Sequence, residues 1–180
     1  MQNNKLIKER MEQAWDKCKG WITEFDGAVT EVFLADVQCD IFQSAIFKLS
    51  SMFHNFSTRL TWLDEVPDEQ TENQLTLKQR LHKLMNREVA NMDVLYIVKF
   101  PDFDFHVHII VDMNDKNLVD LDVIWWSDEV FPEGVNEKER FFSIASHFID
   151  LQNLFQSECL YLAPENMETP SPDCNHWMMV

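Results

Sequence analysis

The chain has 180 residues, a formal net charge of -16, 46% hydrophobic residues, 14 Phe and 6 Trp. This length and apolar content predict one folded domain with a substantial core. Only 3 Gly occur, which argues against the glycine-rich phosphate loops of nucleotide-binding enzymes, and the sequence lacks a cationic stripe for binding DNA or RNA.

The first third of the chain contains two predicted helices and one ambiguous segment. Apolar residues at three- and four-residue spacing predict an amphipathic helix that begins near Ile7 and ends near Gly20. Residues 28–37 are left open between strand and helix, because they are rich in β-branched and aromatic residues while their apolar spacing also fits a helix. Residues 38–53 predict the second helix.

Three features follow between residues 58 and 89. Weak alternation through Leu60 and Trp62 predicts a short strand at residues 58–63. Residues 64–73 hold five carboxylates and one proline without apolar periodicity, so we expect an exposed loop. Residues 75–89 predict a third helix with its leucines inward and its cations outward. The cations expected outward are Lys78, Arg80, Lys83 and Arg87.

Residues 93–127 carry the strongest strand pattern in the chain. Residues 94–98 form a β-branched and aromatic run, and residues 103–111 and 118–126 alternate apolar with polar side chains, as in strands with one dry and one wet face. Opposed residues in a hairpin share a face, so only an odd-length connection brings the two apolar sets together. We therefore expect a three- or five-residue connection, with both histidines of the first strand on the face of Asp120 and Asp122.

The remainder of the chain predicts one long helix and a short strand. Asn136 and Glu139 have the spacing of a capping box. An apolar stripe then continues to about residue 156 and should cover the dry face of the sheet; it consists of Phe141, Ile144, Ala145, Phe148, Leu151 and Phe155. A strand is expected at residues 160–162, and a loose tail from about residue 163. The predicted fold class is α+β, with an antiparallel sheet of at least three strands, at residues 93–127, packed against several helices in a single domain spanning residues 1–180.

The cysteines and the N-terminal residues predict a cytoplasmic location. Cys18, Cys39, Cys159 and Cys174 have no CxxC spacing, and the first residues lack the apolar core of a signal peptide. No apolar run is long enough to span a bilayer. A nucleophilic pair of Cys174 with His176, or of Cys159 with His147, is disfavoured because the surrounding sequence lacks the cations that stabilise a thiolate.

Two histidines on the predicted hairpin form a candidate metal site. His106 and His108 lie two residues apart on one strand, so their imidazoles point the same way, and Asp104 or Asp122 can supply an oxygen ligand. Such a set suits Zn²⁺ and would give a small metal-dependent hydrolase. The same alternation is also typical of an ordinary solvent-facing sheet surface, which is the favoured interpretation.

The acidic hairpin favours a binding protein over an enzyme. Between Asp102 and Glu137 ten carboxylates accompany the single cation Lys116, and Trp126 should project from the wet face unless the tail or an N-terminal helix covers it. An aromatic anchor among carboxylates is typical of a surface that recognises a basic protein. The candidate partner-binding residues are Asp104, Asp120, Asp122, Trp126, Asp128 and Glu129.

The sequence therefore predicts an acidic cytosolic protein-binding module with no cofactor. Its most concrete form is an immunity- or antitoxin-type inhibitor that occupies a basic surface of a toxin or nuclease, an expectation that rests on composition. The alternatives are the Zn²⁺-dependent hydrolase and a nucleic-acid-mimic inhibitor whose carboxylates take the place of phosphates. Direct binding to nucleic acid or to a membrane is not expected.

Overall fold

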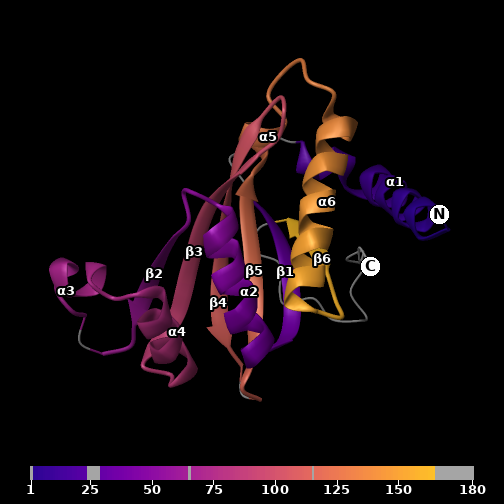
Figure 1. Cartoon of the computed structure of the whole chain (residues 1–180). Helices are drawn as coiled ribbons and strands as arrows, with labels where there is room; N and C mark the ends of the chain where they lie inside the picture. The colour runs from indigo at the N-terminus through magenta and orange to yellow at the C-terminus, as the bar shows by residue number, and fades with distance from the viewer. Residues whose placement is uncertain (1, 24–28, 65, 115, 165–180) are drawn as a thin grey trace.

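The protein is an α+β fold built on one antiparallel sheet (Figure 1). The computed structural model describes residues 2–23, 29–64, 66–114 and 116–164. The six strands lie in the order β2-β3-β4-β5-β1-β6. They are β1 (Val29–Gln38), β2 (Ser57–Trp62), β3 (Val89–Lys99), β4 (Asp104–Met113), β5 (Leu118–Trp126) and β6 (Tyr161–Pro164). The helices are α1 (Gln2–Ile22), α2 (Cys39–Met52), α3 (Glu69–Asn73), α4 (Leu77–Met85), α5 (Ser127–Val130) and α6 (Glu137–Phe155).

The central hairpin of β4 and β5 confirms the predicted register. Ile109 is paired with Val123, and the backbone N–H of Asn114 donates to the carbonyl of Leu118 at 3.0 Å, which leaves residues 115–117 as an odd-length connection. Asn117 has a φ of 59°, a left-handed conformation that asparagine adopts more readily than most residues. The two apolar sets therefore meet on one face.

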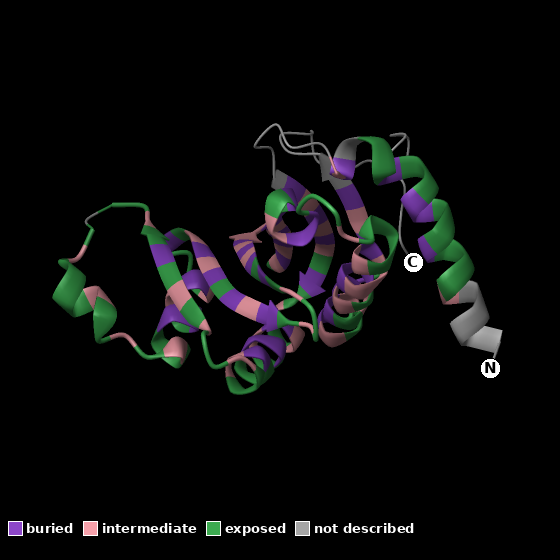
Figure 2. Cartoon of the chain, turned by 90° about the horizontal axis from the view of Figure 1, so that it is seen from above, coloured by how far each residue is buried: buried purple, intermediate pink, exposed green. Residues whose placement is uncertain are grey.

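That apolar face is covered by helices α2 and α6, which lie in front of the central strands in Figure 1. Figure 2 shows the result as alternating buried and partly exposed bands along the strands. The predicted stripe of α6 is entirely buried and consists of Phe141, Ile144, Ala145, Phe148, Leu151 and Phe155. The Asn136 side chain accepts the N–H of Glu139 and begins this helix as expected.

Strand β1 resolves the segment that the sequence left open. Its register shifts between Leu34 and Val37, which are both buried, so one extra residue lets both side chains reach the core. Asp36 has a φ of 55° at this bulge, and its backbone N–H donates to Asp120 Oδ1 at 2.9 Å. The bulge therefore ties β1 to the polar side of β5.

The region before β3 differs from the expectation in two ways. The predicted loop at residues 64–73 includes the short helix α3, and the third predicted helix ends at Met85 rather than continuing to Val89, which begins β3. Arg80, expected outward, is only 7% exposed. Its Nη2 donates to the carbonyl of Glu72 at 2.6 Å, and its Nη1 lies 3.4 Å from Glu72 Oε1. Because those acceptors satisfy the guanidinium, the charge tolerates burial.

The described part of the chain ends with strand β6. Strand β6 pairs with β1 as far as Pro164. Residues 165–180, where the loose tail is expected, lie outside the described residues. Cys18, Cys39 and Cys159 are free thiols. Within the described ranges, no helix combines the length and apolar character needed to cross a membrane.

Candidate functional site: the open face of the sheet

The candidate site is the sheet face opposite α2 and α6, which we call the open face. Along β3, β4 and β5 its side chains alternate with the core residues and are all partly or fully exposed. The open face includes His106 and His108 of β4 together with Asp120 and Asp122 of β5, as the sequence predicted. Among the described residues, the buried side chains of α2, α4 and α6 join the core on the other side.

Three aspartates lie near one another on β4 and β5, toward the hairpin connection, and we call Asp112, Asp120 and Asp122 the acid row. Asp112 stands directly opposite Asp120 in the register of β4 and β5. Burial, followed by the neighbouring charges of Glu31, Asp112 and Asp120, raises the pKa of Asp122 to about 6. Burial, followed by repulsion from Asp120 and Asp93, also raises the pKa of Asp112. Keeping Asp112 and Asp122 ionised therefore costs the folded protein free energy.

One end of the open face contains a pocket of about 290 Å³, which we call the end pocket. It lies where β5 separates from β4, because the last paired residues on this side are His108 and Ile124 and the chain turns into α5 at Ser127. Its lining residues are Leu95, Tyr96, His106, Val107, His108, Trp126, Asp128 and Glu129. The side chains of Tyr96 and Val107 point into the core, so these residues offer main-chain atoms to the floor.

Glu129 closes the edge of β4 that β5 leaves unpaired. Its Oε2 accepts the backbone N–H of His106 at 2.8 Å, and its Oε1 lies 2.8 Å from Nδ1 of the same residue. A side-chain carboxylate thus replaces the strand carbonyl that would otherwise satisfy this donor. Sequence analysis included Glu129 only as part of an acidic patch, because its pairing depends on where the β4–β5 ladder ends.

The predicted metal ligands are not brought together. His106 faces Glu129, whereas His108 Nε2 lies 3.2 Å from Asp93 Oδ1. The Asp104 carboxylate lies 3.9 Å from Lys99 Nζ. Asp122 is paired with Ile110, two residues further along β4 than His108. In the part of the chain that the structure describes, no group of three or more His, Cys, Asp or Glu side chains is arranged to hold a metal ion.

Two large apolar side chains stand exposed at the end pocket. Trp126 is 37% exposed and Leu95 is 39% exposed, so both side chains keep part of their apolar surface open to solvent. The acidic neighbours of Trp126 in the pocket are Asp128 and Glu129, while Asp120 and Asp122 lie further back along β5. Leu95 was not predicted as a site residue, although its strand parity, opposite to that of the buried Tyr96, would have placed it on the open face.

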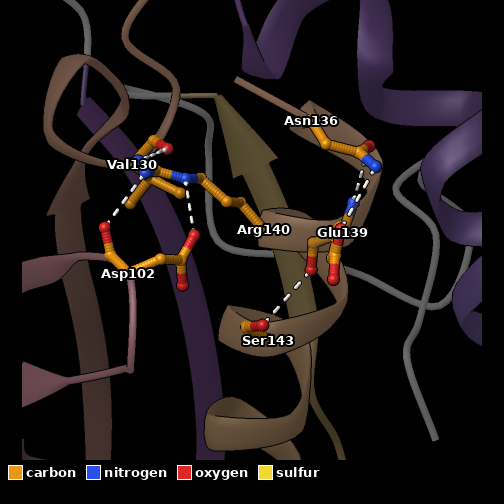
Figure 3. Close-up of polar contacts among 6 residues, drawn as sticks. All are labelled: Asp102, Val130, Asn136, Glu139, Arg140 and Ser143. Atoms are coloured by element: carbon orange, nitrogen blue, oxygen red, sulfur yellow. Dashed lines mark hydrogen bonds and ion pairs between the residues drawn. The ribbon is translucent and has the colours of Figure 1, made fainter.

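Arg140, on the first turn of α6, holds α5 in place behind the pocket. Its Nη1 donates to the carbonyl of Val130 at 2.9 Å, and its Nη2 donates to the carbonyl of Asp102 at 3.3 Å (Figure 3). The guanidinium also lies 3.5 Å from the Asp102 carboxylate and 4.4 Å from the ring centroid of Phe103. One side chain therefore connects α6, the end of α5 and the turn between β3 and β4.

Cys159 and His147, the one disfavoured thiol–histidine pair that lies within the described residues, have other polar partners. His147 Nε2 lies 3.0 Å from the hydroxyl of Tyr96, and burial lowers the pKa of this histidine to about 4. Cys159 instead contacts Ser157 through backbone and hydroxyl hydrogen bonds. Cys174 and His176 lie outside the described residues.

Comparisons of the chain with protein-family models, curated protein sequences and solved structures found no match. The assignment of function therefore rests on the geometry of the open face. That face presents exposed apolar groups, carboxylates and a shallow pocket, which are elements of a recognition surface.

Proposed function

We propose that the protein is a non-enzymatic binding module whose open face docks on a basic surface of another protein. The observation that carries this proposal is the combination of two exposed apolar side chains, Leu95 and Trp126, with the acid row on one sheet face. Aromatic side chains supply most of the energy at the centre of many interfaces, and complementary charge steers the partners together.

The charges on this face favour a cationic occupant over a second copy of the chain. Two open faces placed together would bring acid rows toward each other, and Asp122 already has a raised pKa through burial and neighbouring carboxylates. A lysine or arginine from a partner would relieve that repulsion.

The most concrete form of this function is an immunity- or antitoxin-type inhibitor in a reducing cytoplasm. A net charge of -16 suits a protein that covers the cationic surface of a toxin or nuclease, and the free thiols Cys18, Cys39 and Cys159 agree with a reducing compartment. The hydrolase alternative is less well supported because its four candidate ligands do not converge among the described residues.

The proposal can be tested by comparing retention of partner proteins by the wild-type chain and by three variants. In D120K/D122K the reversed charges should slow association and flatten its dependence on salt. Trp126→Ala should instead speed dissociation by about tenfold or more, as expected for a central anchor. Phe47→Ala is the matched control, since Phe47 is 44% exposed on α2, away from the open face.

A partner retained by wild type and Phe47→Ala, but lost from the two open-face variants, would support the proposal. Circular dichroism and denaturant titration should accompany each variant, so that loss of the fold is not read as loss of binding. Equal retention by all four proteins would show that the open face is not the interface.

A further inference from the structure

We propose that the end pocket receives an arginine side chain of the partner, an inference that rests on the proposed function and specifies its ligand. The pocket joins an exposed indole, an aliphatic wall and a carboxylate, contributed by Trp126, Leu95 and Asp128. A guanidinium stacks on an aromatic ring and forms forked hydrogen bonds to a carboxylate, while its methylene stem packs on apolar surface.

The carboxylates of the pocket differ in their availability. Glu129 is engaged twice by His106, at 2.8 Å through the backbone N–H and at 2.8 Å through the ring. Asp128 is exposed and has no ion-pair partner among the described residues. Asp128 is the second residue of α5 and lines the same pocket as Trp126, so it is the acid best placed to take a cation.

The rest of the lining also favours a single cationic side chain. Within the pocket His108 is already paired with Asp93 at 3.2 Å, and His106 is paired with Glu129, so neither imidazole is left to attract an anion. The volume of about 290 Å³ is at the lower end for small-ligand sites, which are about 300–1,000 Å³. This size matches a single side chain better than a large cofactor.

Arginine is preferred over lysine because of the shape of the site. An ammonium is a compact, strongly hydrated charge, whereas the guanidinium is planar and more weakly hydrated, so it can lie against the indole and face the carboxylate at once. A neutral analogue of the same shape, citrulline, keeps the packing and loses the charge. Comparing the binding of arginine and citrulline therefore distinguishes recognition of the charge from burial of the side chain alone.

The test uses N-acetyl-arginine amide and N-acetyl-citrulline amide at pH 7.5, with binding followed by NMR at the indole N–H of Trp126. Substitution of Trp126 by Phe identifies that signal among the 6 Trp residues. We expect saturable binding of the arginine compound at about millimolar concentration, and binding of the citrulline compound at least about fivefold weaker.

Asp128→Asn should reduce arginine binding to the citrulline level. Asp104→Asn is the matched control, because Asp104 is an exposed carboxylate on the same face but does not line the pocket. Equal binding of the two compounds would overturn the inference, because it would show that burial alone drives binding. Equal losses of arginine binding in the two variants would also overturn it, because they would show diffuse attraction to the acidic surface.

The outcome is independent of the retention experiment. A partner that needs the open face, together with equal binding of the arginine and citrulline compounds, would remove the arginine site and leave the proposed function standing. Selective arginine binding that depends on Asp128, with no partner retained through the open face, would support the pocket and contradict the proposed docking surface.

Discussion

Replacing Asp122 by Asn should stabilise the protein at neutral pH and leave it almost unchanged in acid. Asp122 is half-buried on the open face, where burial and then the charges of Glu31, Asp112 and Asp120 raise its pKa from 3.8 to about 6. Between those two values the folded protein keeps a proton that the unfolded chain has lost. The free energy of unfolding therefore falls as pH rises through this window, and Asn removes that loss.

The magnitude follows from the size of the shift. A change of about two pKa units corresponds to about 3 kcal/mol between the protonation states, at about 1.4 kcal/mol per unit. Asp122 retains contact with water, so screening reduces the expected gain to about 1–2 kcal/mol above pH 6.5. At pH 4 the folded chain is almost fully protonated at this position and the unfolded chain, with a pKa of 3.8, is still partly protonated, so the gain should fall below about 0.5 kcal/mol.

Urea titrations of wild type and Asp122→Asn at pH 4 and pH 7.5 measure this difference directly. The control is Glu133→Gln, at an exposed position, which should change the free energy of unfolding by less than about 0.5 kcal/mol at either pH. An equal gain at both pH values would mean that the amide packs better, rather than that a charge was removed. No gain at pH 7.5 would refute the electrostatic account of the acid row.

Two further substitutions test the packing behind the open face. Phe148→Ala should lower the free energy of unfolding by about 3–5 kcal/mol, because the ring is buried between α6 and the sheet beside Phe105 and Trp125. A loss below about 1 kcal/mol in denaturant titration would contradict this placement. Arg140→Gln should cost about 1–3 kcal/mol by removing its charge-assisted contacts to α5 and Asp102. The exposed Lys138→Gln is its control, and equal small losses in both would show that Arg140 does not hold α5.

Local patterns were sufficient for the elements whose residues repeat with a clear period. The two-residue alternation of residues 103–111 and 118–126 predicted both faces of the hairpin, and its parity predicted the odd-length connection that residues 115–117 provide. The spacing of the α6 stripe predicted every buried residue of that helix. These predictions succeed because side-chain direction in a strand or helix depends on the neighbouring residues alone.

Contacts between distant segments decided the rest. Residues 28–37 fit both a helical and a strand pattern, and pairing with both β5 and β6 makes residues 29–38 strand β1. Arg80 looked like a surface cation, but a helix in the predicted loop supplies Glu72 as its partner. In both cases the deciding partner lies outside the local window of sequence.

The features of the candidate site also fall into those that the sequence predicted and those that depend on tertiary contacts. Strand parity alone placed Trp126, Asp120, Asp122 and both histidines on one face. The end pocket exists because the ladder between β4 and β5 stops at His108 and Ile124 and Glu129 takes the free N–H of His106. The raised pKa of Asp122 likewise depends on Glu31, which reaches it from β1. Charge and parity are properties of the sequence, whereas pockets, pairings and pKa shifts arise from which strands become neighbours.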